Sequence, residues 1–344
     1  MNKVISGYLD HNILDSILKG DPFKIVTLLH ACDITPVFSY ENLIEIKRSI
    51  GSEADFLSLL DQMNAKYIEP CYENNLITDN AQIHDCDIGA LWNWFVKNHD
   101  AMPEYGYGLG GMLEKFYGGR SDESYSDIFT RGTEELNNLL NEALSDIDPN
   151  GILTTDMKVA LRELPIFLNA QHQQISTELD NQNQSEVKDF EKATSVGPKI
   201  LKNIKPPNVI QQVFDAIQKS IPDVALDIDQ FFGVTSQEFE PNPDRQKSMP
   251  EKVNAIYHQL NFLGYYRDTD MKKKRGFIRS TSDMTHAGAA SYCNLLLSCD
   301  EGLVKKAEAA YEYLNAKTRI LHFRNVKKKQ IHSKSEGRSS SLMC

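Results

Sequence analysis

Short apolar segments alternate with helical patterns at both ends of the chain but not in its middle. Near the N-terminus the expected strands are residues 3–9, 35–38 and 66–69, and near the C-terminus they are 295–298 and 319–323. Strands separated by helices are typical of a parallel α/β sheet. We therefore predict an α/β fold with a doubly wound parallel sheet whose strands come from both ends of the sequence.

The middle of the chain follows a different pattern, mostly helical with polar loops and little that resembles a strand. Neither terminal α/β portion is large enough to be a doubly wound sheet by itself, whereas the two together are about the right size. A helical insertion that interrupts one α/β domain explains both observations. The expected parts are a first core segment at 1–69, the helical insertion at 70–271, a second core segment at 272–325, and a basic, disordered tail at 326–344.

Composition excludes several classes of protein. With 344 residues, 41% hydrophobic and 25% charged, the chain resembles a globular protein with an ample core. Its six cysteines form no CxxC pair, which favours a reduced, intracellular setting. We recognise no signal peptide at the start of this sequence, and no apolar run is long enough to cross a bilayer. We expect a cytoplasmic protein that does not contact a membrane.

The charge distribution bears on nucleic-acid binding. A net charge of −11 argues against a surface that is basic everywhere. The basic residues are clustered, however, with one cluster just before Asp283 and another between Lys317 and Arg338, where Glu336 is the one acid. These clusters either contact phosphates or are merely a solvated loop and a tail. The candidate phosphate contacts are Lys272, Lys273, Lys274, Arg275 and Arg279.

Four acidic residues lie near the ends of expected strands. Asp10 follows the first strand, Glu45 is on the helix after the second, and Asp283 and Asp300 precede and follow the strand at 295–298. Ligands of doubly wound sheets bind at the carboxyl ends of the strands. Acids gathered there repel one another unless a cation neutralises them, and Mg²⁺ or Mn²⁺ is the usual cation for oxygen ligands. Two such ions would activate a water for phosphodiester hydrolysis.

Each acid also has a simpler explanation. Asp10, Asp283 and Asp300 each precede a helix and could be N-caps. Glu41 lies one helical turn from Glu45 on the same face and is an alternative second acid. Three independent caps beside a glutamate, in this order, are less expected than one shared site.

A serine and two histidines lie near these acids in the sequence. Ser39 is expected to cap the helix over 40–48 or to orient a carboxylate. His11 and His286 adjoin the acids and could approach a scissile phosphate, but hydrolysis by a metal-activated water needs no general-base histidine, so neither is counted among the site residues.

The order of these residues resembles that of PIN-like domain nucleases. The resemblance covers about residues 1–68 and 272–325, and its strongest part is the segment from Asp283 to Asp300, two acids seventeen residues apart on either side of an Ala-rich helix and a strand. The resemblance implies that the four acids bind the metal. The residues matched to it are the acids Asp10, Glu45, Asp283 and Asp300 and the supporting residues Asn12, Ser39 and Ser298. Glu41 is kept as a supporting residue because it is the alternative to Glu45, which the family pattern favours.

This resemblance implies a Mg²⁺- or Mn²⁺-dependent nuclease that acts on RNA, such as an endoribonuclease used as a toxin or defence effector. The alternatives are a structure-selective DNA nuclease and a non-catalytic PIN-like binding or scaffold protein. The helical insertion would shape the substrate channel, mediate homo-oligomerisation or bind a regulatory protein.

Overall fold

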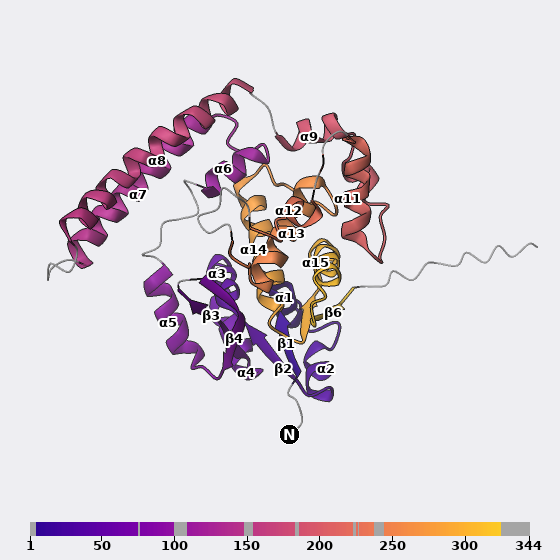
Figure 1. The fold of residues 1–344 in the computed structure, drawn as a ribbon. Helices are drawn as coiled ribbons and strands as arrows, with labels where there is room; N and C mark the ends of the chain where they lie inside the picture. Colours follow the sequence, from indigo (N-terminus) through magenta and orange to yellow (C-terminus); the bar gives the residue numbers. More distant parts are fainter. Residues whose placement is uncertain are drawn as a thin grey trace, which may run out of the picture.

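A six-stranded sheet lies at one end of the molecule, and most helices of the middle region lie at the other (Figure 1). The structure is a computed structural model. It describes residues 5–74, 76–99, 109–147, 154–182, 186–222, 225, 227–236 and 244–324. The predicted basic tail at 326–344 lies outside these residues. No helix of the described ranges combines the length and the apolar character that crossing a membrane requires.

The sheet draws its strands from both ends of the chain, in the order β4-β3-β2-β1-β5-β6. All neighbouring strands are parallel except β3 and β4. This confirms the predicted α/β class with a mostly parallel sheet. Because β1 has β2 on one side and β5 on the other, the switch in strand order lies at the end of β1. The strands are β1 (Ile5–Leu9), β2 (Ile34–Phe38), β3 (Lys66–Glu73), β4 (Leu76–His84), β5 (Leu295–Ser298) and β6 (Arg319–His322).

The prediction that residues from 70 onward are mostly helical was wrong for the first part of that region, which forms strands. We expected strand character to end at residue 69, but β3 continues to Glu73 and β4 pairs with it antiparallel over Leu76–His84. Strand β4 forms the edge of the sheet, and none of its residues is fully buried. An edge strand with little burial lacks the apolar alternation by which strands are recognised.

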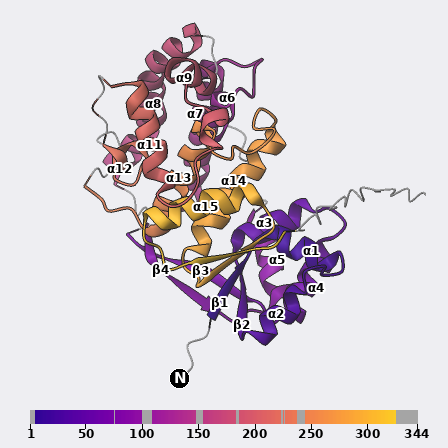
Figure 2. The ribbon, with the colours of Figure 1, turned by 90° about the vertical axis from the view of Figure 1, so that its right-hand side faces the viewer.

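Helices cover both faces of the sheet (Figure 2). A hydrophobic core lies on each face of the sheet, and neighbouring residues of one strand point into different cores. On β1, Leu9 packs into the first core and Tyr8 into the second. On β5, Leu297 packs into the first core and Leu296 into the second. The strands are therefore buried on both sides, as parallel strands usually are. The first face is covered by α1 (His11–Leu18), α2 (Ile25–Ala31), α3 (Tyr40–Arg48), α4 (Glu53–Gln62) and α5 (Ile88–His99), and the second by α11 (Val209–Ser220), α13 (Met249–Leu263), α14 (Lys274–Ala290) and α15 (Glu301–Tyr313).

Part of the expected insertion belongs to the core of the sheet. Val213 of α11 and Leu260 of α13 are fully buried in the same cluster as Tyr8 of β1. Helices α7 and α8 instead form a long hairpin that extends away from the body, and α8 exposes Ile166 and Phe167 (Figure 1). The remaining helices are α6 (Leu109–Phe116), α7 (Tyr125–Ile147), α8 (Thr155–Gln182), α9 (Glu186–Thr194), α10 (Pro198–Leu201) and α12 (Ile228–Phe231).

Candidate metal centre

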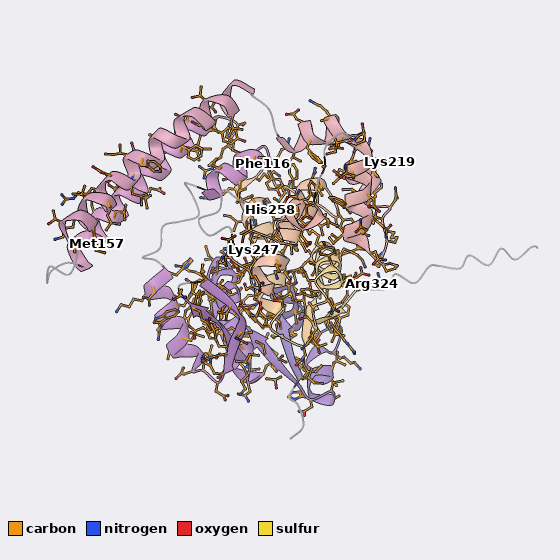
Figure 3. The ribbon with its side chains drawn as sticks, in the orientation of Figure 1. Phe116, Met157, Lys219, Lys247, His258 and Arg324 are labelled. Carbon is orange, nitrogen blue, oxygen red and sulfur yellow. The ribbon has the colours of Figure 1, made fainter. Side chains whose placement is uncertain are left out.

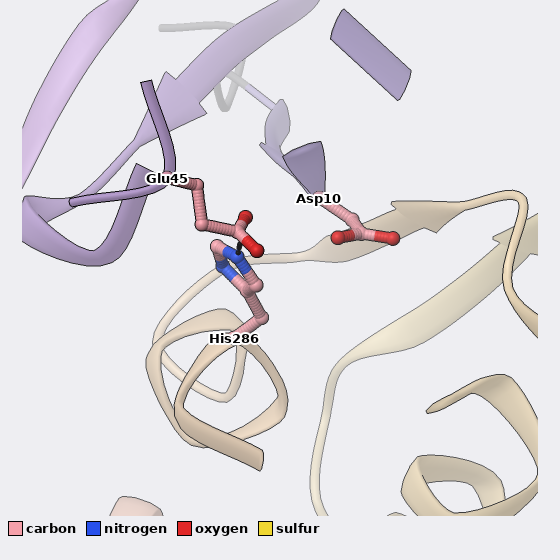
Figure 4. A group of neighbouring side chains, drawn as sticks. All are labelled: Asp10, Glu45 and His286. Atoms are coloured by element: carbon pink, nitrogen blue, oxygen red, sulfur yellow. Dashed lines mark hydrogen bonds and ion pairs between the residues drawn. The ribbon is translucent and has the colours of Figure 1, made fainter. Parts of the chain in front are cut away.

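Three side chains from distant parts of the chain converge at the carboxyl end of β1. Asp10 follows this strand, Glu45 lies on α3 and His286 lies on α14, and Figure 4 shows the three facing a common space. Each offers one ligand atom, and these atoms all lie within 4.8 Å of one another. Two carboxylates and one imidazole are a donor set that can hold a divalent cation.

Asp10 is oriented by hydrogen bonds and does not cap a helix. It occupies the N-cap position of α1, but its side chain makes no capping hydrogen bond. Instead its Oδ2 accepts hydrogen bonds from Ser298 Oγ at 2.7 Å and Asn12 Nδ2 at 3.1 Å. Burial raises the pKa of Asp10; the positive charge of His286 opposes this shift, and the charge of Glu45 adds to it. A buried carboxylate held in this way is available to a cation.

Ser298 connects Asp10 to Asp300. Its buried hydroxyl donates to Asp10 and accepts a hydrogen bond from the Asp300 backbone N–H at 3.0 Å. Asp300 itself is an N-cap of α15, because its Oδ1 accepts from the Leu303 backbone N–H at 2.8 Å. Asp300 is therefore an N-cap, as the simpler explanation proposed, but capping uses only its Oδ1 atom.

Asp283 does not begin a helix, which corrects our expectation. Helix α14 starts at Lys274, nine residues earlier, so Asp283 lies in its interior and is 6% exposed. Gly276 lies in the first turn of α14, although glycine is a poor helix former. Here a Cβ would collide with the Asp270 carbonyl, which explains the glycine. Burial raises the pKa of Asp283 well above its usual value, and the charges of Asp10, Asp268 and Asp300 raise it further.

His286 is the residue that our sequence analysis left without a role. It is fully buried, and its Nε2 lies 2.7 Å from Glu45 Oε2. Its Nδ1 lies 2.7 Å from Tyr8 Oη, which in turn lies 2.7 Å from Ser39 Oγ. Burial lowers the pKa of His286, but the charge and hydrogen bond of Glu45 outweigh this effect and raise it to about 9. The protonated ring thus neutralises part of the acidic cluster when no cation is bound.

Of the two glutamates that competed for the second acid, Glu45 shares the three-residue group and Glu41 does not. Glu41 Oε1 accepts a hydrogen bond from Ser282 Oγ at 2.6 Å and lies 3.6 Å from Arg48. Ser39 caps α3 by accepting from the Glu41 backbone N–H, as expected, and it also contacts Tyr8. Ser39 therefore caps α3 and also forms a hydrogen bond with Tyr8, the residue that contacts His286 Nδ1.

A buried ion pair lies next to the acids and was not expected from the sequence. Lys306 Nζ on α15 is 2.5 Å from Asp268 Oδ1 and 3.3 Å from Asn261 Oδ1, and it sits 4.4 Å from the centre of the Tyr257 ring. Lys306 is fully buried. Lysines on a helix usually lie on its solvent-exposed face, so nothing in the sequence indicated that Lys306 is buried.

The predicted phosphate contacts lie around the first turns of α14. The helix rises about 1.5 Å per residue, so Lys274 is roughly 14 Å along the axis from Asp283. Lys273 pairs with Asp270 at 3.1 Å, and Arg279 donates to the Thr269 hydroxyl at 3.0 Å. Lys272 and Arg275 flank the same end of the helix. Lys272, Lys273, Lys274 and Arg275 thus form a basic end of α14, whereas Arg279 lies about one helical turn before Asp283.

Unpartnered polar atoms around the group indicate that a cation would fit. His11 Nδ1 is buried without a hydrogen-bond partner among the described residues, 3.9 Å from Glu45 Oε2. Tyr257 Oη is likewise unpartnered there; burial, and then the charge of Asp283, raises the pKa of Tyr257. A cation with its water shell at the three-residue group would supply a partner for His11 Nδ1. The imidazole in the donor set favours Mn²⁺ over the Mg²⁺ of an all-oxygen site.

Comparisons with known proteins offer no assignment: no protein-family model matches the chain, and neither a curated protein nor a solved structure gives a significant match.

Proposed function

We propose that the protein is a metal-dependent nuclease that hydrolyses phosphodiester bonds of RNA in the cytoplasm. The observation that carries this proposal is the convergence of Asp10, Glu45 and His286 within 4.8 Å at the end of β1. That position, beside the switch in strand order, is where doubly wound folds bind ligands. The resemblance to PIN-like nucleases supports phosphodiester hydrolysis, and the choice of RNA over DNA rests on that resemblance alone.

The three residues would hold one divalent cation, preferably Mn²⁺, and the cation would supply Lewis acidity toward water and phosphate. Ser298 and Asn12 fix the Asp10 carboxylate by hydrogen bonds. His286 must release its Nε2 proton before that nitrogen can become a ligand. Its Nδ1–H can then donate to Tyr8 Oη, and the Tyr8 hydroxyl to Ser39, which fixes the ring orientation.

A non-catalytic binding protein is the second candidate, and the His286–Glu45 contact favours it. A protonated His286 beside an ionised Glu45 balances much of the negative charge without a cation, and the raised pKa of Asp283 favours its neutral form. The acids can therefore lie close together without a metal ion, so their proximity alone does not require one. A structure-selective DNA nuclease is the other enzymatic alternative.

A cleavage assay separates these candidates. End-labelled single-stranded RNA, hairpin RNA and duplex DNA would be incubated with the full chain in Mn²⁺, Mg²⁺ or EDTA. We expect Mn²⁺-dependent cleavage of RNA that falls at least about 100-fold in Asp10→Asn and His286→Asn. The matched control is Asp15→Asn, a half-buried acid on α1 paired with Lys19.

Equal cleavage by wild type and Asp10→Asn would exclude the site. Cleavage of DNA alone would move the assignment to the DNA nuclease. Binding of RNA without cleavage in any metal would favour the non-catalytic candidate.

A further inference from the structure

A cavity of about 240 Å³ lies between α6, α13 and α14. Its walls are largely apolar, and a small cluster of buried side chains that includes Tyr117 and Phe277 borders it. Figure 3 labels His258, one of its lining residues, below Phe116, and the ring of His258 lies 5.9 Å from that of Tyr117. The residues that line it include Leu113, Tyr117, Tyr257, His258, Phe277 and Met284.

The cavity adjoins the candidate metal centre through one helix and one tyrosine. Phe277, Thr281 and Met284 recur at helical spacing on α14 and line the cavity. Asp283 precedes Met284 directly, and the same helix carries His286. Tyr257 lines the cavity too, and its hydroxyl is close enough to Asp283 for that charge to raise its pKa. A ligand in the cavity would therefore lie next to the acids.

The chemistry of the walls selects an uncharged ligand. The described residues that line the cavity include no aspartate, glutamate, lysine or arginine. Burial lowers the pKa of His258, so its imidazole is neutral at neutral pH. A phosphate would find no cation there. A planar ring would find the aromatic side chains of Tyr117 and Phe277.

Two polar atoms of the lining residues lack hydrogen-bond partners in the described part of the chain. They are Tyr257 Oη and His258 Nε2. Buried polar groups without partners destabilise a protein, and ligand sites commonly combine apolar walls with a few such groups. An aromatic ring with donors and acceptors along its edge would fill the space and satisfy these atoms.

We propose that this cavity binds a nucleobase of the substrate strand, and that the base in the cavity sets the adjoining phosphate at the Asp10–Glu45–His286 group. The identification of the ligand as a base rests on the proposed nuclease function. Single-stranded RNA is recognised in this way in general, by bases turned out of the stack onto aromatic side chains.

Binding can be measured without cleavage. The full chain in EDTA would be titrated by calorimetry with adenosine, guanosine, cytidine and uridine, and separately with ribose 5-phosphate and indole. We expect at least one nucleoside to bind and ribose 5-phosphate not to bind. Met284→Trp, which fills the cavity, should weaken that binding at least tenfold; Leu113→Phe serves if the first variant does not fold.

A matched control and a polar variant make the test specific. Val26→Trp adds similar bulk at a separate cavity beside β2 and should leave nucleoside binding unchanged. Tyr257→Phe removes the unpartnered hydroxyl and should weaken nucleoside binding about tenfold without weakening indole. Indole that binds as tightly as the best nucleoside, or ribose 5-phosphate that binds while nucleosides do not, would overturn the proposal.

The result is also distinguishable from that for the nuclease. Nucleoside binding that Met284→Trp abolishes, in a protein that never cleaves, would support the cavity and sink the nuclease. Metal-dependent cleavage with no nucleoside binding and no effect of Met284→Trp would overturn the cavity and leave the nuclease standing.

Discussion

His286 Nε2 lies 2.7 Å from Glu45 Oε2, although 241 residues separate the two along the chain. The contact joins α14 to α3 across the end of the sheet. The proposed cation would use the same nitrogen, because His286 Nδ1 already lies 2.7 Å from Tyr8 Oη, together with a carboxylate oxygen of Glu45. A proton on His286 and a metal ion therefore compete for the same place, and this competition makes the site testable without knowledge of its substrate.

The affinity for Mn²⁺ should depend on pH. Because the pKa of His286 is raised to about 9, a cation that binds Nε2 at neutral pH must displace a proton. We expect the association constant to rise about tenfold per pH unit from pH 7 toward 9 and to level off above that. Calorimetry in buffers of different ionisation enthalpy would count the protons released. An affinity that does not change over this range would show that His286 is not a ligand.

Without metal, stability should fall as the pH rises. The folded-state pKa of His286 is about 9, above its usual 6.5, so the folded protein holds this proton more tightly than the unfolded chain. The resulting stabilisation is complete below about pH 6.5, is lost as the pH rises through 9, and amounts to on the order of 3 kcal/mol. Urea unfolding in EDTA at pH 6 and pH 9.5 measures it. His286→Asn should lose this difference; a variant with the same pH dependence as wild type would contradict the assignment.

Asp283→Asn should stabilise the metal-free protein. Burial and the neighbouring acids raise the pKa of Asp283, so the folded state favours its neutral form, which asparagine resembles. The native group contributes most below its unfolded pKa of about 4 and costs stability as the pH rises above that. The gain from the substitution should therefore be larger at pH 8 than at pH 4. Thermal melting in EDTA at both pH values is the measurement, and a lower melting temperature at pH 8 would refute the expected gain.

The pair of Lys306 and Asp268 should show strong coupling. Lys306→Met leaves the Asp268 carboxylate in a buried position without its cation and should cost about 3–5 kcal/mol. The double variant Lys306→Met/Asp268→Asn should recover much of that loss, because it removes both charges. A double-mutant cycle by urea unfolding at pH 7 measures the coupling. Additive losses would mean that the two charges are solvated and independent.

Local signals in the sequence were sufficient for several elements. The helix over Tyr40–Arg48 and the strand Leu295–Ser298 have the expected bounds, because Ser39 is a strong cap and the strand is a short apolar run. Strand β4 was missed because an exposed edge strand weakens the apolar alternation, and the start of α14 was missed because Asp283 before an Ala-rich run resembles an N-cap. The strand-end positions of Asp10 and Ser298 followed directly from the correct strands.

The sequence by itself determined the class of fold and the edge of the sheet where polar residues gather, since periodicity and capping encode local conformation. The tertiary structure decided which side chains meet. It brought His286 to Glu45, enclosed Lys306 with Asp268, and left Asp300 with an oxygen that caps α15. Contacts of this kind depend on how helices from distant parts of the chain pack over the sheet, and spacing along one segment carries no record of that packing.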